Sequence, residues 1–197
     1  MKTKLQALVA VGGLIAAGLL SAPAANASPN IITNGGFETG GFDGWTTSNL
    51  NATGVEASGF DGYAPEEGNY FVGMGNVGSD GVIEQTVADT AGASYALTYW
   101  LSGNGTGFSD FSVAWNGNQL DGSYFSNFSF PWTQFSFTVV GTGSDTLTFF
   151  ERNDPSYDAL DDVQLSATTD TPVPGALALL GFGLVGLGGI RRKAKAS

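Results

Sequence analysis

Carboxylates are the main residues of this sequence that could do chemistry. The chain of 197 residues contains 18 Asp and Glu and 7 Lys and Arg, but neither histidine nor cysteine. This composition excludes Ser-His-Asp and Cys-His nucleophilic sites, ordinary zinc sites and disulfides. Carboxylates that gather without lysines favour Ca²⁺. A carboxylate pair can also hydrolyse a glycosidic bond, but no spacing singles out such a pair, and we predict that the protein is not an enzyme.

The charges are strongly separated along the chain. All acidic residues lie between residues 28 and 170, where Arg152 is the only basic residue. So acidic a stretch repels phosphate backbones, which excludes ordinary binding to nucleic acid. It also requires counter-ions, so we expect some of these carboxylates to bind cations and the others to form a solvated acidic surface.

Two short motifs lie near the two ends of the acidic stretch. The first is Asn-Gly-Gly-Phe-Glu at residues 34–38, followed by Gly-Trp at residues 44–45, and the second is Leu-Asp-Asp-Val-Gln-Leu at residues 160–165. Together they resemble the opening and the closing strand of galactose-binding-like jelly-roll domains, a group to which many carbohydrate-binding modules belong. The resemblance implies that the first and last strands lie close together and hold a structural calcium ion.

The resemblance also implies which residues bind this calcium. They are Glu38 and either Asp161 or Asp162, helped by backbone carbonyls near Asn34. Because the side chains of a strand alternate between its faces, the two aspartates point in opposite directions and only one is expected to be a ligand. By this alternation Asp161 shares a face with Val163. The alternative is two polar strand ends that bind no metal.

Aromatic residues are the candidates for contact with a ligand. Sugar-binding sites use exposed Trp and Tyr side chains as flat platforms, with carboxylates and amides nearby for the hydroxyl groups. We expect Trp100 to face solvent, and Tyr124 and Trp132 to flank an aromatic contact loop at residues 123–131. Trp115 alternates in step with apolar residues and is expected in the core, as is Trp45.

The elements that must position these residues are strands. Apolar residues alternate with polar ones at a period of two, and Asp-Gly and Asn-Gly turn dipeptides separate the alternating runs. The strands expected from this pattern are 82–87, 94–102, 111–115, 134–139, 146–149 and 160–165, with weaker candidates at 50–56 and 70–72. Because no window has the period of an amphipathic helix, we predict an all-β domain at residues 28–170, an antiparallel β-sandwich of the jelly-roll, galactose-binding-like kind.

The first 27 residues are expected to be a signal peptide that forms a helix. Lys2 and Lys4 precede an apolar run, and Ala25-Asn26-Ala27 is a small-residue cleavage site, so signal peptidase would leave Ser28 as the first mature residue. The alternative is an anchor that is retained. Either reading implies that the domain is exported.

The last 27 residues have three parts in a fixed order. Pro172-Val173-Pro174 comes first, a glycine-rich apolar segment at 175–190 follows, and a basic tail at 191–197 begins with Arg191, Arg192 and Lys193. The apolar segment is shorter than the ~20 residues of a typical membrane-spanning helix, and the basic tail would remain on the cytoplasmic side. An ordinary single-pass anchor is one interpretation of this hydrophobic helix.

The tripartite order resembles the PEP-CTERM sorting signal. In that family an exosortase-type transpeptidase recognises Pro-Glu-Pro, whereas this chain has Val173 in place of the glutamate. The resemblance implies a transient stay in the inner membrane through the C-terminal segment, followed by delivery to the cell surface or to an extracellular matrix or biofilm. Loops similar to Arg152-Asn153-Asp154-Pro155 also occur in sandwich domains attached to such tails, and we expect Arg152 to form a structural ion pair there rather than to bind a ligand.

Three functions are compatible with these features. The first is a non-catalytic protein that binds extracellular polysaccharide. The second is a structural or adhesive surface protein without glycan specificity, and the third is a glycoside hydrolase that uses two carboxylates. Exposed aromatic residues in one patch would favour the first, a smooth acidic surface the second, and two carboxylates converging in a cleft the third.

Overall fold

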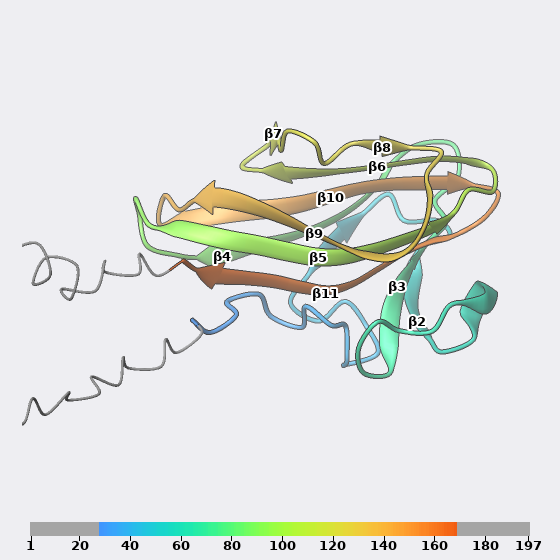
Figure 1. Cartoon of the computed structure of the whole chain (residues 1–197), viewed down its shortest axis with the longest axis horizontal. Coiled ribbons are helices and arrows are strands. Elements are labelled where there is room, and N and C mark those ends of the chain that lie inside the picture. Colours follow the sequence, from blue (N-terminus) through green and yellow to red (C-terminus); the bar gives the residue numbers. More distant parts are fainter. Residues whose placement is uncertain (1–27, 169–197) are drawn as a thin grey trace, which may run out of the picture.

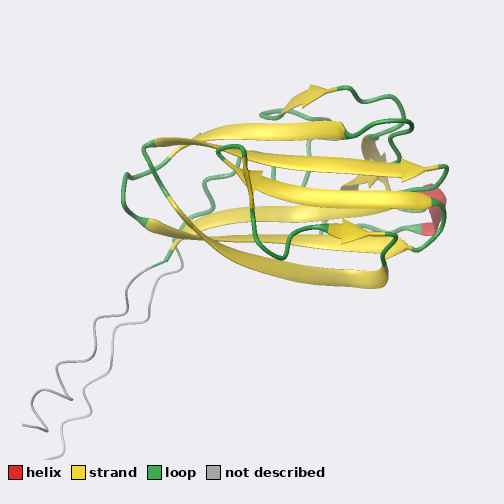
Figure 2. Cartoon of the chain, turned by 90° about the horizontal axis from the view of Figure 1, so that it is seen from above, coloured by secondary structure: helices red, strands yellow, loops and turns green. Residues whose placement is uncertain are grey.

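The computed structural model describes residues 28–168, which form two antiparallel sheets packed face to face (Figures 1 and 2). The predicted signal peptide (1–27) and sorting signal (171–197), with the helices expected in them, lie outside the described residues. In the part that is described, no helix is long and apolar enough to cross a membrane. The predicted all-β, antiparallel sandwich is confirmed.

One sheet has six strands in the order β1-β4-β10-β6-β7, with β8 paired to β6. Its strands are β1 (Thr46–Ser48), β4 (Gly81–Ala88), β6 (Phe108–Trp115), β7 (Asn118–Gln119), β8 (Phe125–Ser126) and β10 (Ser144–Asp154). The long strand β10 lies between β4 and β6 along most of its length. We call this the β10 sheet.

The second sheet has five strands in the order β2-β3-β11-β5-β9. Its strands are β2 (Gly54–Ala57), β3 (Tyr70–Met74), β5 (Ser94–Asn104), β9 (Ser129–Val140) and β11 (Asp158–Ala167). A single turn of 3-10 helix, η1 (Phe60–Gly62), lies between β2 and β3 in the chain. We call this the β11 sheet.

The core lies between the sheets and follows the alternation expected from the sequence. On β5, Tyr95, Leu97, Tyr99 and Leu101 are buried, whereas Trp100 between them is half-buried. Aromatic rings from the two sheets pack against each other in the core. Tyr99 of the β11 sheet contacts Phe149 of the β10 sheet edge-on, with 5.5 Å between the ring centroids. Trp45 and Trp115 are both buried in this core, as predicted.

The N-terminal segment runs beside the last strand, so the two sequence motifs are close in space (Figure 1). The backbone of Ile31 donates to Leu165, and that of Val163 donates to Gly35 at 3.0 Å. A side chain at Gly35 would place its Cβ 2.0 Å from the Val163 carbonyl oxygen, so only glycine permits this approach. Residues 30–35 form only an isolated bridge to β11, not a full strand.

Residues 123–131 were expected to be an aromatic loop and are in large part strand. β8 and the beginning of β9 lie in this stretch. The reason is packing, because the ring of Phe128 lies 5.0 Å from that of Phe130 and 6.0 Å from that of Phe125. Phe128, between β8 and β9, is buried in the main core, and its contacts fix the two strands that flank it.

Candidate functional site

A second aromatic cluster lies on the face of the β11 sheet that points away from the β10 sheet. Phe71 of β3 is fully buried, yet it is not part of the main core. Its ring meets Tyr63 at 6.0 Å and Trp132 at 6.3 Å between centroids. The segment 58–69, which contains η1, therefore crosses this outer face and covers Phe71.

Hydrogen bonds through the side chains of Trp132, Tyr63 and Asp161 hold the crossing segment against the β11 sheet. The Trp132 indole donates to the Ala64 carbonyl at 2.9 Å, and the Tyr63 hydroxyl donates to the Tyr157 carbonyl at 3.1 Å. The backbone N–H of Glu66 donates to the carboxylate of Asp161 at 2.9 Å. The segment is thus held in one position over the sheet.

A cleft of about 370 Å³ lies where the crossing segment meets the ends of β5 and β9. Residues of three short stretches line it: Asp61, Gly62, Tyr63, Ser102, Gly103, Asn104, Ser129, Phe130 and Pro131. Tyr63 and Phe130 are half-buried and supply apolar surface, whereas Asp61, Asn104 and Ser129 are exposed polar groups. The cleft therefore combines aromatic walls with hydrogen-bonding groups at its rim.

The local structure around the cleft orients its polar groups. Asp61 has a left-handed backbone (φ 45), which Asp and Asn adopt more readily than other residues, and its side chain is exposed. The Asn104 side chain accepts a hydrogen bond from the Thr106 N–H and donates one to Ser156. Burial, together with the carboxylates of Asp158 and Asp61, raises the pKa of Tyr63, so its hydroxyl stays protonated.

None of the three aromatic residues predicted to bind a ligand lines this cleft. Trp132 packs against Tyr63 and Phe71 and anchors the crossing segment. Trp100 is half-buried on the outer face, opposite Gln134 of β9. Tyr124 is 54% exposed and precedes β8, so it belongs to the other sheet. The structure does not bring the three together.

Two of the sequence segments that line the cleft contain turn dipeptides, which predict turns but not a binding site. Asp61-Gly62 and Asn104-Gly105 are turn dipeptides of the kind that ends many strands. Nothing local distinguishes them from the exposed turn at Asp121-Gly122. Only the tertiary fold brings the first two to one place, because it lays η1 over the β11 sheet beside the end of β5.

Of the four predicted calcium ligands, Glu38 and Asp161 reach the same loop, residues 66–70. Glu38 accepts hydrogen bonds from the backbone N–H groups of Asn69 at 2.8 Å and Tyr70 at 3.0 Å, which lower the pKa of its carboxyl group. Asp161 is fully buried, and its burial raises its pKa to about 7 although three backbone N–H groups donate to it.

The other two predicted ligands have different contacts. Asp162 has a left-handed backbone (φ 43) and accepts two hydrogen bonds from the Gln164 amide, at 2.8 and 2.9 Å. The side chain of Asn34 ties its own turn together by donating to the carbonyls of Gly41 and Asp43. The backbone carbonyl of Asn34 accepts a hydrogen bond from the indole of Trp45 at 3.1 Å.

A β-bulge corrects the predicted orientation of Asp161. Asp161 pairs with Trp100 and Gln164 with Thr98, so β11 has one residue more than β5 over this stretch. Asp161 therefore faces outward with Trp100, while Val163 faces the core. The prediction that Asp161 and Val163 share a face was wrong because strict alternation ignores the extra residue.

The arrangement of the four residues does not by itself make a calcium site. The carboxylates of Glu38 and Asp161 accept hydrogen bonds from backbone N–H groups. The side chains of Asp162 and Asn34 form hydrogen bonds with Gln164 and with the Gly41 carbonyl, respectively. Within residues 28–168, no group of three or more His, Cys, Asp or Glu side chains is placed to hold a metal ion. Calcium binding by these residues stays a prediction.

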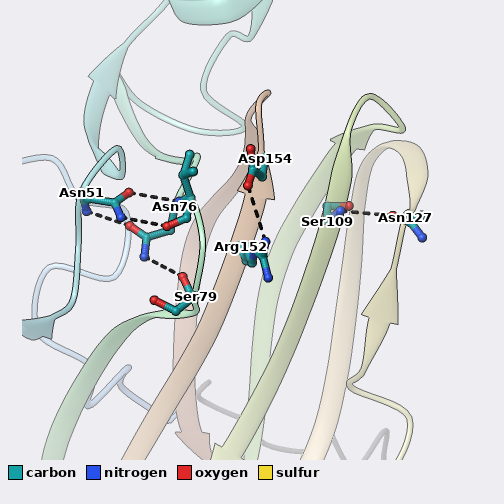
Figure 3. Close-up of polar contacts among 8 residues, drawn as sticks. Asn51, Asn76, Ser79, Ser109, Asn127, Arg152 and Asp154 are labelled. Atoms are coloured by element: carbon teal, nitrogen blue, oxygen red, sulfur yellow. Dashed lines mark hydrogen bonds and ion pairs between the residues drawn. The ribbon is translucent and has the colours of Figure 1, made fainter.

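Arg152 forms an ion pair on the outer face of the β10 sheet. Its guanidinium lies 3.4 Å from the carboxylate of Asp154, and Figure 3 shows the pair on β10. The same guanidinium lies 4.8 Å from the ring centroid of Phe108, a cation–π contact. The predicted structural role of Arg152 agrees with this geometry.

Comparison with known proteins places the fold. No protein-family model matches the sequence, and no curated protein matches it. The chain is similar to TmCBM61, solved in complex with β-1,4-galactotriose, at 24% identity and a TM-score of 0.56, over 72% of this chain and 100% of that chain. It is also similar to the CBM22-1 xylan-binding domain from Paenibacillus barcinonensis, at 14% identity and a TM-score of 0.53, over 75% of this chain and 100% of that chain.

A third similar structure belongs to a larger protein. It is the enzymatically active domain of tailspike protein 4 of bacteriophage CBA120, with 14% identity and a TM-score of 0.51, over 71% of this chain and 21% of that chain. Identities this low show a shared fold. The β-sandwich of this chain is thus the architecture found in carbohydrate-binding modules.

Proposed function

We propose that this chain is an exported, non-catalytic protein that binds extracellular polysaccharide in the cleft beside η1. The observation that carries the proposal is the composition of that cleft. Half-buried Tyr63 and Phe130 stand beside the exposed polar side chains of Asp61, Asn104 and Ser129. Sugar rings have apolar faces and polar edges, so aromatic walls and a rim of carboxylate, amide and hydroxyl groups suit them.

The anchoring of the cleft supports binding. The crossing segment is tied to the sheet through Trp132, Tyr63 and Asp161, so Asp61 and Tyr63 are positioned before any ligand arrives. A preorganised site loses less conformational entropy on binding than a mobile loop does. Two similar sandwiches, TmCBM61 and the CBM22-1 domain, are described as complexed with β-1,4-galactotriose and as xylan-binding, respectively.

The same cleft favours binding over hydrolysis. Asp61 is the one carboxylate among the described residues that line it. Hydrolysis of a glycosidic bond by the common mechanisms needs two carboxyl groups about 5–9.5 Å apart across the bond. The acidic cleft residue is therefore proposed to accept hydrogen bonds from sugar hydroxyls.

Binding to polysaccharide is tested by substituting Asp61. Asp61→Asn keeps the side-chain shape and suits the left-handed backbone, but it removes the charge. Because a hydrogen bond to a charged group contributes about 1.5–3 kcal/mol, we expect the affinity for a bound glycan to fall roughly 10- to 100-fold. Affinity electrophoresis against a panel of polysaccharides, including the host's exopolysaccharide, would measure this.

Asp121→Asn is the matched control, because Asp121 is exposed in a second Asp-Gly turn that does not line the cleft. The control is expected to bind as the parent does. Equal loss in both variants would indicate a general effect of negative charge. No binding to any polysaccharide would favour the structural or adhesive surface role instead.

A further inference from the structure

One end of the main core is closed by polar side chains from both sheets. On β10, Glu151 and Asn153 continue the face on which Phe149 points to the core, and on β11 Asp158 stands two residues before Leu160. All three polar side chains are buried, with exposed fractions of 1%, 1% and 2%. We call Glu151, Asn153 and Asp158 the end cluster.

The end cluster is connected to the neighbouring loop through Asn76. The N–H of Asn76 donates to Glu151 at 3.4 Å, a long contact, and the carbonyl of Asn76 accepts from the N–H of Asn153 at 3.1 Å. Asn76 is itself held by hydrogen bonds to Asn51 and to Ser79 (Figure 3). The backbone around the cluster is therefore fixed.

Several polar atoms of the cluster have no partner. The Oδ1 atom of Asp158 and both the Oδ1 and Nδ2 atoms of Asn153 are buried and make no hydrogen bond of good geometry, although the side chains of Asn153 and Ser109 lie near enough to Asp158 to oppose the rise in its pKa. Glu151 has one short hydrogen bond, from the Thr53 hydroxyl at 2.6 Å. Buried polar groups are almost always paired in folded proteins, so unpaired atoms on adjacent side chains indicate that something else contacts them.

The two carboxyl groups of the cluster have no basic side chain to compensate their charge when they ionise. Burial raises the pKa of Glu151 and of Asp158 to about 7, and the charge of Glu151 contributes to the shift at Asp158. Arg152 is the only basic side chain in the described part of the chain, and it is engaged with Asp154 (Figure 3). Two buried carboxylates without a cationic side chain can be neutralised by protons or by a metal ion.

We propose that Glu151, Asn153 and Asp158 bind a hard cation, with Ca²⁺ as the ion of choice, at this end of the core. The available donors are carboxylate and amide oxygens, which are the ligands that Ca²⁺ prefers and that thiophilic metals do not. The hydroxyl of Ser109 lies beside Asp158 as a further oxygen donor. An ion here pairs the orphaned oxygens and compensates the charge at once.

This site is distinct from the calcium site predicted at Glu38 and Asp161. Asp161 faces outward from the β11 sheet, whereas the end cluster faces the core between the two sheets. The cluster also lies behind the cleft, because a Cβ atom on the cleft residue Gly103 would stand 2.9 Å from the unpaired Oδ1 of Asp158. A bound ion therefore holds the ends of β10 and β11 in place behind the cleft floor.

The proposal is tested by measuring how many calcium ions the purified protein binds. The protein is first treated with chelator and is then dialysed to equilibrium against ⁴⁵Ca²⁺ in the absence of glycan. The double substitution Glu151→Gln and Asp158→Asn preserves shape and removes both charges. We expect it to bind one Ca²⁺ per chain fewer than the parent, and to lose the part of the calcium-induced rise in Tm that this ion supplies. If the double variant folds poorly, Glu151→Gln alone is expected to weaken that binding step at least tenfold.

Two controls separate this site from other sources of calcium binding. Asp154→Asn makes the same change at a partly exposed position at the end of β10 and is expected to leave the stoichiometry unchanged. Glu38→Gln reports on the outer site, and its effect is expected to add to that of the double variant. Equal calcium stoichiometry in parent and double variant would overturn the proposal. The proposal would also be overturned if the parent protein bound no calcium and the double variant had a higher Tm than the parent. That result would show that the two carboxyl groups are neutralised by protons.

Discussion

Three buried carboxyl groups in the described part of the chain combine a raised pKa with the lack of a basic partner. Glu151 and Asp158 lie at the end of the core, and Asp161 lies under the crossing segment. Burial is the largest cause of the raised pKa of each, which lies at about 7. Ionisation of these buried groups lowers the free energy of unfolding unless hydrogen bonds or a bound ion compensate the charge.

These raised values predict how stability depends on pH. In the unfolded chain the groups titrate near 3.8 for Asp and 4.5 for Glu, and in the folded chain near 7. Between these values the folded state binds more protons, so in chelator the free energy of unfolding is expected to fall as the pH rises from about 4.5 through 7. Urea denaturation at several pH values would measure this slope.

Glu151→Gln is expected to make this slope shallower, because it removes one of the groups that cause it. Glu67→Gln, at an exposed position, is the control and should leave the slope as it is. Stability that rises between pH 5 and 8 in chelator would contradict the assignment of these groups as buried and uncompensated.

At the scale of elements, the crossing segment 58–69 decides whether a cleft exists. It contains little regular structure, only η1, and its position depends on contacts with β3, β9 and β11. Phe71 on β3 supplies the apolar surface under it. The segment thus turns one sheet face into a second small core, with Asp61 and Tyr63 at its edge.

The substitution Trp132→Phe tests this dependence. It keeps an aromatic ring against Phe71 and removes the indole N–H that binds the Ala64 carbonyl. We expect local opening of residues 58–69 to become easier by about 1 kcal/mol, with a several-fold loss of glycan affinity. Hydrogen exchange of this segment, measured by mass spectrometry, would show the change.

Trp100→Phe provides the matched control, because the indole of Trp100 makes no hydrogen bond within residues 28–168 and does not line the cleft. Unchanged exchange of residues 58–69 is expected there. If Trp132→Phe weakened glycan binding with no change in exchange, direct contact between Trp132 and the glycan would explain the loss instead.

At the scale of the whole molecule, the sequence places an acidic sandwich domain between two basic terminal segments. All acidic residues lie between residues 28 and 170, and all basic residues except Arg152 lie outside that stretch. We propose that the N-terminal segment directs export and that the C-terminal segment, with Pro172–Pro174, directs sorting by an exosortase-type enzyme to the cell surface or matrix. A net negative domain is suited to a hydrated polysaccharide matrix with its counter-ions.

Deleting residues 172–197 tests the sorting proposal in the producing cell. The truncated protein is expected in the medium or periplasm rather than at the surface, because the apolar segment and its basic stop are gone. Fractionation followed by immunoblotting would measure the distribution. Replacing Arg191, Arg192 and Lys193 by glutamine is a milder variant, and retention at the surface after the full deletion would contradict a sorting role.

The sequence by itself determined the class of the fold, because side chains alternate along a strand whatever its neighbours are. The period of two in residues 94–102 predicted the buried face of β5, and the turn dipeptide Asn104-Gly105 marked its C-terminal end. The motifs at Asn34–Glu38 and Leu160–Leu165 correctly implied that the beginning of the domain lies beside its last strand. Composition alone excluded histidine and cysteine chemistry.

Only the tertiary structure decided which polar residues meet. Asp61 and Asn104 are 43 positions apart, and they share a cleft because η1 folds back over the β11 sheet. One extra residue in β11 turned Asp161 outward, a shift that no periodic pattern reveals. Glu151 and Asp158 come from different sheets and are brought together by the packing of those sheets. Local patterns follow from the geometry of one strand, whereas sites depend on the register between strands, which long-range packing sets.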